Sequence, residues 1–149
     1  MLRSILIGLV AGQRGMTPLA AVTAAAVRGR LPARTPGAAL LGHPVVAGGA
    51  ALLAAAEMAG DKMPTAPDRT VPPGLIARGL TAGFAGAALA RERRALAAGL
   101  AAATAIAASY AGLALRRRAM RRWGQTPTGF VEDAAVLSGG LAIALVPSR

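Results

Sequence analysis

Long apolar stretches, separated by short polar or basic ones, set the pattern of this chain. A helix that crosses a bilayer needs roughly 20 apolar residues. Stretches near that length cover about residues 2–27, 37–59, 74–90, 95–115 and 127–146. The pattern predicts an all-α fold: a polytopic membrane helix bundle with about four or five transmembrane segments, in a single membrane domain over residues 1–149.

The first apolar stretch is interrupted by polar residues and glycines between Gly12 and Pro18. Thr17-Pro18 is typical of a helix start, because a threonine hydroxyl can cap free amides and proline needs no N–H at the first helical position. We therefore expect the first segment to be two half-helices. Non-helical backbone at membrane depth is tolerated only when it is buried in protein or lines a wet cavity.

Proline also marks the later segment starts. Thr35-Pro36 and Thr126-Pro127 repeat the Thr-Pro pattern before the second and last segments. His43-Pro44 predicts either a kink in the second segment or its later true start. We expect His43 to be solvated or to cap a helix. The proline-rich residues 63–73 cannot be helical throughout, so they predict an extended, stiff connection.

Small residues recur at helical spacing within the segments. Gly8 and Gly12 are four apart, as are Gly79 and Gly83. Such faces let another helix approach closely. We expect them to pack helices together, and to favour a homodimer or higher homo-oligomer over a monomer.

The composition indicates lipid rather than water as the main solvent. Mean hydropathy is +0.51 and 15% of residues are charged, against about 25% in an ordinary soluble domain. The formal net charge of +11 comes from arginines clustered at the ends of apolar stretches, without interleaved aromatic residues for base stacking. We therefore expect the lipid bilayer as a partner and no nucleic acid. The arginine clusters, predicted to be loops, lie at 28–34, 91–94 and 116–122.

With five crossing segments, the first two arginine clusters fall on one side of the membrane and the third on the other.

Several chemistries are disfavoured: cysteine is absent and His43 is the only histidine. No Walker loop, Ser-His-Asp order or metal-ligand spacing is present, so we predict no cofactor and no metal site. Tyr110 and Trp123 are predicted to be interfacial anchors.

The polar stretch from Glu57 to Arg78 holds three of the six acidic residues and the only lysine, Lys62. Glu57 and Asp61 are four apart, so they share a helix face and need a cation between them. The candidates are Lys62, Arg69, Arg78 and the distant Arg14. The alternative is an interfacial loop whose charges meet only water and lipid head groups.

Arg14 lies in the middle of the first apolar segment, beside the break. A charge at mid-bilayer costs about 2.5 to 3.5 kcal/mol on insertion scales, so it usually marks a functional path. With the free N–H groups of the helix start at Thr17, it could form an anion cradle. The alternative is a structural ion pair with Glu57, Glu132 or Asp133.

Glu132 and Asp133 follow Pro127 inside the last apolar segment. Adjacent helical residues diverge by about 100°, so they cannot face one point together. We expect one to face the bundle interior and the other to reach the interface or a partner chain. A carboxylate there could relay protons or coordinate a cation; the alternative is favourable placement near a helix start.

Five pieces of the chain, spanning most of its length, resemble an uncharacterised bacterial integral membrane protein family known as a domain of unknown function. The charged pieces are the more specific ones. The resemblance implies a multi-pass protein of the bacterial inner membrane and no particular reaction. The matching pieces are Gly8–Pro18, Glu57–Arg69, Arg78–Ala87, Tyr110–Arg116 and Glu132–Ala134.

The sequence favours a small membrane transporter or channel for a small ion or anionic solute, through a polar centre in the bundle. A membrane-embedded enzyme acting on a phospholipid or isoprenoid phosphate is the alternative, with Lys62, Arg69 and Arg78 holding phosphate and Asp61 or Glu57 as base or metal ligand. The residues expected to bind substrate or ion are Arg14, Thr17, Glu57, Asp61, Lys62, Arg69, Arg78, Glu132 and Asp133.

In a third hypothesis the protein is structural and its charges only pair. The presence and shape of a cavity distinguish the three hypotheses. A closed cavity at mid-membrane favours transport. A lipid-shaped groove near Asp61 that is open to the bilayer favours the membrane-embedded enzyme, and the structural hypothesis predicts no cavity at all.

Overall fold

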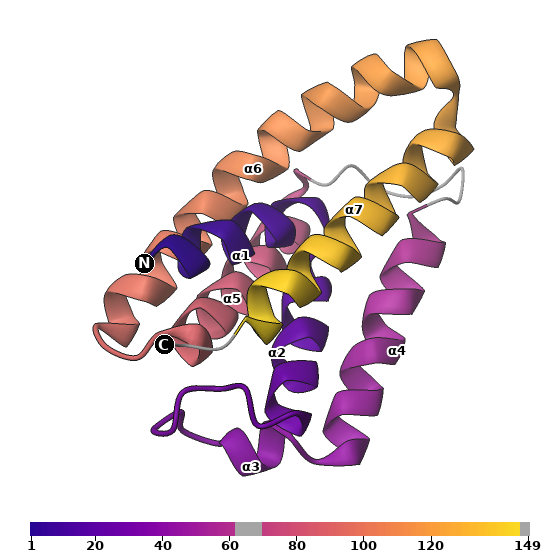
Figure 1. Cartoon of the computed structure of the whole chain (residues 1–149). Coiled ribbons are helices and arrows are strands. Elements are labelled where there is room, and N and C mark those ends of the chain that lie inside the picture. Colours follow the sequence, from indigo (N-terminus) through magenta and orange to yellow (C-terminus); the bar gives the residue numbers. More distant parts are fainter. Residues whose placement is uncertain (62–69, 147–149) are drawn as a thin grey trace.

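The computed structural model describes residues 1–61 and 70–146. All regular structure in these residues is α-helical, which confirms the all-α part of the prediction (Figure 1). The helices in these two ranges are α1 (Leu2–Gln13), α2 (Thr17–Val27), α3 (Ala38–Leu41), α4 (Pro44–Gly60), α5 (Pro72–Leu89), α6 (Arg94–Trp123) and α7 (Gln125–Leu145).

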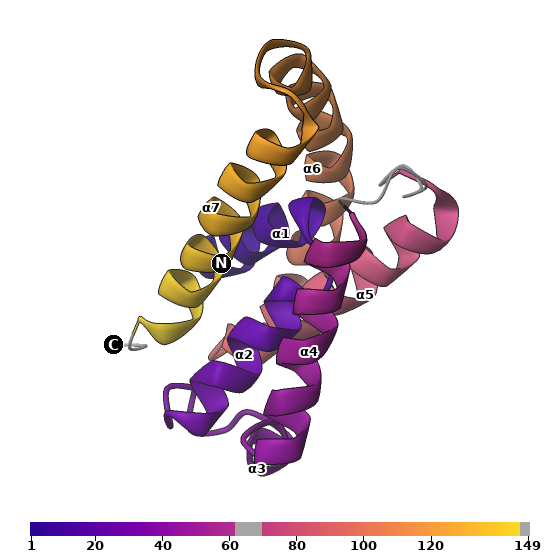
Figure 2. The same ribbon diagram turned by 90° about the vertical axis from the view of Figure 1, so that its right-hand side faces the viewer.

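The helices pack in two groups that meet at the break between α1 and α2. Helix α1 packs against α6, α5 and α7, and α5 also packs along α6. Helix α2 packs between α7 and α4, and α4 lies at the edge of the molecule beside α2 (Figure 1 and Figure 2). Arg3 of α1 donates to the backbone oxygen of Ile143 at 2.9 Å, which fastens α1 to the end of α7.

The predicted break in the first apolar segment is confirmed. Helix α1 ends at Gln13 and α2 begins at Thr17, with Arg14 in an extended conformation between them. At 1.5 Å per residue the two helices are about 18 Å and 16 Å long, so neither alone spans a hydrocarbon core of about 30 Å. The break therefore places irregular backbone, and the arginine on it, inside the bundle.

The second segment starts later than Thr35-Pro36 predicts. Only the short α3 follows Pro36, and the long helix α4 begins at Pro44. The true start at His43-Pro44 is therefore confirmed, as is the capping role, because the N–H of Val45 donates to the Nδ1 of His43 at 3.3 Å. The Thr35 hydroxyl donates instead to the backbone oxygen of Ala88 at 3.1 Å and ties this loop to the end of α5.

Helix α6 is longer than predicted. The expected segment ends near residue 115, but α6 continues to Trp123, so the arginine cluster at 116–122 is helical and the predicted loop is wrong. Arginine is a good helix former, and cations stabilise the C-terminal end of a helix. Gly124, with a φ of 83°, then turns the chain, and α7 begins at Gln125 rather than at Pro127.

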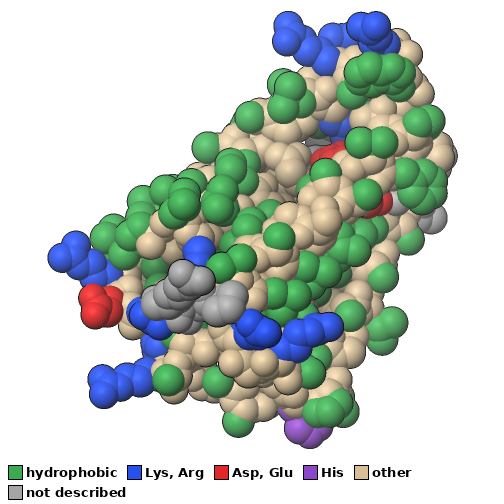
Figure 3. Space-filling view, viewed as in Figure 1, with side chains coloured by type: hydrophobic (Ala, Val, Ile, Leu, Met, Phe, Trp, Pro, Cys, Tyr) green, Lys and Arg blue, Asp and Glu red, His purple; other side chains and the backbone are tan. Residues whose placement is uncertain are grey.

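Small residues fill the interior and large apolar residues cover the outside. Fourteen of the twenty buried hydrophobic residues in the described ranges are alanine. Leu52, Ile76 and Phe130 are each more than 60% exposed, and the apolar side chains in Figure 3 cover much of the surface. Helix bundles in lipid have this arrangement, because tails solvate large apolar side chains and small residues permit close packing.

Within the described residues, two helices, α6 and α7, are long and apolar enough to cross a membrane, whereas α1, α2 and α4 are shorter apolar helices. The helical fold is thus shown, and the predicted number of four or five crossings remains a prediction. The first apolar stretch is divided, the second begins at Pro44, and α5 is not among the helices whose length and composition would allow a crossing.

The glycine faces pack helices within the chain. A Cβ on Gly12 would lie 2.5 Å from the Cβ of Ala108, and one on Gly86 would lie 2.6 Å from that of Ala101. Both glycines are needed for the close approach of α1 and α5 to α6. Gly79 has open space around it, so it packs no helix of the described part of the chain. Because α6 occupies the face around Gly12, that face gives no support to the expected homo-oligomer, which stays a prediction.

Candidate functional site

The break between α1 and α2 positions the guanidinium of Arg14 inside the protein. Arg14 is fully buried. Its Nη1 donates to the Oδ2 of Asp61 at 2.6 Å, and its Nε donates to the Oδ1 of Asp133 at 2.7 Å. Its Nη2 lies 2.6 Å from the same oxygen of Asp133, as an ion pair without hydrogen-bond alignment. A buried charge needs such compensation, so the prediction that Arg14 has an anionic partner is confirmed for Asp133, and Asp61 is a second partner.

Asp61 is shared between Arg14 and a second arginine that the sequence did not single out. Its carboxylate also contacts the Nη1 of Arg116, and the Nη2 of Arg116 donates to its backbone oxygen at 3.2 Å. The signal was present in the spacing: Arg116 follows Gly112 by four residues and Ser109 by seven, and both are buried on α6. Residues at these spacings share a helix face.

Glu57 occupies the start of α2. Its two carboxylate oxygens accept the N–H groups of Gly15 and Met16, each at 2.8 Å. The Nη2 of Arg78 lies 3.7 Å from its Oε1. The helix N-terminus predicted to cradle an external anion therefore binds a carboxylate of the chain itself. Carboxylates are favoured there by the helix dipole and by the free N–H groups.

Thr17 does not cap α2 as predicted. It is the first helical residue, the N-cap is Met16, and no side chain of the cap residue bonds the helix. Thr17 is fully buried, and its methyl group lies 3.3 Å from where a Cβ of Gly140 would stand. Its hydroxyl has no hydrogen-bond partner within the described parts of the chain. Thr17 therefore packs α2 against α7.

Glu132 and Asp133 both join the network, which differs from the expectation that only one would face inwards. Asp133 lies on the buried stripe of α7 and binds Arg14. The Oε2 of Glu132 lies 3.7 Å from the Nη1 of Arg116, and its side chain is 15% exposed. The two side chains point in different directions, as predicted. Each lies near an arginine from a different element: Asp133 contacts Arg14, and Glu132 lies near Arg116.

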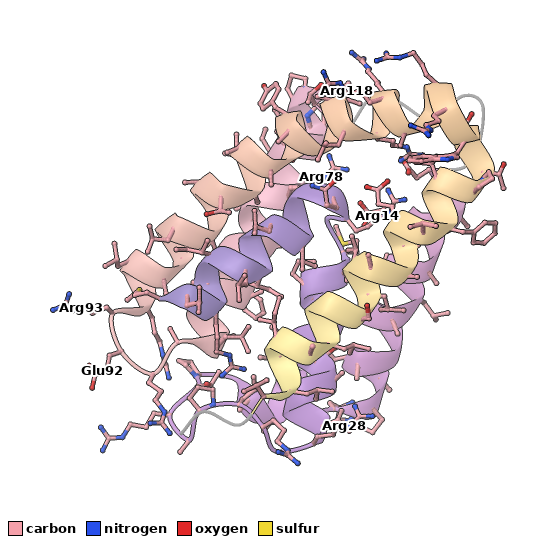
Figure 4. The ribbon with its side chains drawn as sticks, turned by 45° about the horizontal axis from the view of Figure 1, so that its top comes forward. Arg14, Arg28, Arg78, Glu92, Arg93 and Arg118 are labelled. Atoms are coloured by element: carbon pink, nitrogen blue, oxygen red, sulfur yellow. The ribbon has the colours of Figure 1, made fainter. Side chains whose placement is uncertain are left out.

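The network thus joins five elements through residues far apart in sequence. Figure 4 shows Arg14 and Arg78 directed into the bundle, whereas Arg28, Glu92 and Arg93 lie at its edge. Lys62 and Arg69, also predicted to bind substrate or ion, lie outside the described residues. Within the described ranges, no group of three or more His, Asp or Glu side chains is placed to hold a metal ion.

A groove of about 870 Å³ opens between α6 and α7 and reaches the network. Acidic and basic side-chain atoms are visible recessed between these two helices in Figure 3. Most of its lining is apolar, with polar groups from Gln13, Arg116 and Glu132. The remaining lining residues are Gly112, Leu115, Ala119, Trp123, Pro127, Thr128, Val131, Ala135 and Val136.

Comparisons of the chain with protein-family models, with curated proteins and with solved structures gave no match. The resemblance to an uncharacterised bacterial membrane protein family therefore stays a prediction.

Proposed function

We propose that this protein binds an amphipathic, lipid-like molecule in the membrane, with its apolar chain in the groove between α6 and α7. The observation that carries the proposal is the groove itself: about 870 Å³, mostly apolar, with Arg116 and Glu132 in its wall. Pockets for small ligands measure about 300 to 1,000 Å³ and combine an apolar lining with a few placed polar groups.

The polar groups would supply the selectivity. In a bilayer an acyl or prenyl chain already has an apolar solvent, so its transfer into a groove gains little hydrophobic free energy. Binding would then depend on hydrogen bonds and charge at the ligand's polar end. Arg116 is suited to this role because Asp61 fixes its guanidinium, and a pre-positioned group loses little entropy on binding.

The proposal concerns binding and not a reaction. The alternative enzyme hypothesis gave Asp61 or Glu57 the role of base or metal ligand. Asp61 instead contacts two guanidinium groups, and Glu57 accepts two backbone N–H groups. Both carboxylates are thus occupied by groups of the chain itself, which argues against a role of either as the base or metal ligand of a reaction.

A steric block of the groove tests the proposal. Ala135→Trp places a large side chain in the groove, and Ala103→Trp places the same side chain on an exposed part of α6 that does not line it. We expect lipid retained through detergent purification, measured by native mass spectrometry, to be lost in Ala135→Trp and kept in Ala103→Trp. Equal retention in both variants, or none in the unmodified protein, would reject the proposal.

A pathway for a small ion is a second candidate, because α1 and α2 are discontinuous helices that meet at buried ionisable groups. Transporters often bind ions at such breaks. The geometry favours a proton or cation over the anionic solute, since Glu57 already occupies the start of α2 and carboxylates contact Arg14. Proton and anion flux into proteoliposomes tests this; flux unaffected by Arg14→Ala and Asp61→Asn would reject the residue roles.

A further inference from the structure

The C-terminal end of α6 carries a concentrated basic surface that the ion network does not use. Arg118, Arg121 and Arg122 are exposed there and are spaced so that they lie on one face of the helix. No Asp or Glu occurs between Glu92 and Glu132. Like charges three and four residues apart destabilise a helix slightly, so this face favours an anionic partner.

A single aromatic residue completes this surface. Trp123 follows directly, is 63% exposed, and its ring centroid lies 5.4 Å from the guanidinium carbon of Arg122. Tryptophan concentrates at the boundary between hydrocarbon and head groups, where one end of its ring is wet. The same ring lines the groove.

The length of α6 sets the depth of these residues. Its 30 residues extend about 45 Å, which exceeds a hydrocarbon thickness of about 30 Å. When the apolar part that ends near Leu115 lies in hydrocarbon, the next two turns emerge among the head groups. Exposed apolar residues at the neighbouring start of α7, Phe130 and Val131, suit a bilayer better than a nucleic acid.

We propose that Arg118, Arg121, Arg122 and Trp123 bind the head groups of anionic phospholipids. Arginine donates two parallel hydrogen bonds to a phosphate, which suits this target. Each basic residue near an anionic surface contributes about 1 kcal/mol. This proposal does not depend on a ligand in the groove between α6 and α7.

Trp123 is the only tryptophan of the chain, so its fluorescence reports on this surface and on the groove that its ring lines, and substitution of the three arginines separates the two. We would place the purified protein in phosphatidylcholine nanodiscs and raise the share of phosphatidylglycerol. The expected result is a shift in tryptophan emission that saturates with phosphatidylglycerol and is reversed by high salt. An emission that ignores phosphatidylglycerol or salt overturns the proposal, and this measurement needs no variant that might misfold.

Two matched triple variants locate the effect. Replacing Arg118, Arg121 and Arg122 with glutamine should weaken phosphatidylglycerol binding by about 100-fold, from three contributions of the size given above. The same change at the exposed Arg28, Arg30 and Arg34 should leave the emission shift unchanged. An equal loss in both variants shows general charge attraction and overturns the proposal. The proposal is also overturned if single-stranded DNA shifts the tryptophan emission and phosphatidylglycerol does not.

Discussion

Arg116 and Arg118 lie two residues apart on the same helix and have opposite environments. Arg116 is 9% exposed and contacts Asp61, whereas Arg118 is exposed at the end of α6. Two residues turn a helix by about 200°, so one side chain faces the bundle and the other faces outwards. The difference shows that the role of an arginine in this chain depends on helix phase and not on the cluster that contains it.

The same contrast holds for the acidic residues. Glu57 is held by the start of α2 and lies close to Arg78, whereas Glu92 is exposed beside the turn before α6. Each buried charge is matched by a group from another element, and the exposed charge needs no such match. Substitutions at matched buried and exposed positions should therefore separate the two environments.

The largest effect is expected for Arg14→Ala. The substitution removes the guanidinium that contacts the buried Asp133 and one guanidinium that contacts Asp61. Removing one member of a buried ion pair costs about 3 to 5 kcal/mol. Thermal unfolding in detergent, followed by circular dichroism, should show this loss, with the exposed Arg30→Ala as the control. A small change in Arg14→Ala would mean that the carboxylates do not need its charge.

A smaller loss is expected for Arg116→Ala. Arg14 still compensates Asp61, so the expected destabilisation is about 2 kcal/mol, typical of hydrogen bonds to charged groups. Arg118→Ala should leave the unfolding midpoint unchanged. Equal unfolding midpoints in Arg116→Ala and Arg118→Ala would contradict the conclusion that Arg116 faces the bundle and Arg118 faces outwards.

Two glycines of α5 test the packing of that helix on α6. Gly86→Ala should cost about 1 to 3 kcal/mol, because its Cβ would lie 2.8 Å from the backbone oxygen of Ala97. Gly79→Ala meets open space and should stabilise the helix by up to about 1 kcal/mol. Unfolding in detergent measures both, and destabilisation by Gly79→Ala would indicate a contact beyond this chain.

The smallest effect is expected for Glu57→Gln. The amide keeps one oxygen acceptor, so one of the N–H groups of Gly15 and Met16 loses its acceptor, and the charge that favours the start of α2 is lost as well. Loss of about 1 kcal/mol is expected, as for helix-terminus charges and caps. The control is Glu92→Gln, and a measurable loss in that control would show that exposed acidic residues also matter.

Much of the candidate site could be predicted because charge is rare within the apolar stretches of this chain. Arg14, Asp61 and Asp133 stand out against apolar or proline-rich surroundings, and the break at Gly12–Pro18 is encoded locally. Arg116 was missed because it is one of several neighbouring arginines, and only the phase of the buried face of α6 distinguishes it. The Glu57 cap was missed because it joins residues 41 and 42 apart, a separation that no local pattern encodes.

By itself, the sequence determined that the chain is helical, where the first apolar segment breaks, and that its charges are too few to be scattered. Those properties follow from local propensity, proline geometry and the cost of charge in an apolar solvent. Only the tertiary structure decided that Asp61 is shared by Arg14 and Arg116, and that α6 and α7 enclose a groove. These features depend on the relative placement of helices, which long-range packing of small residues fixes.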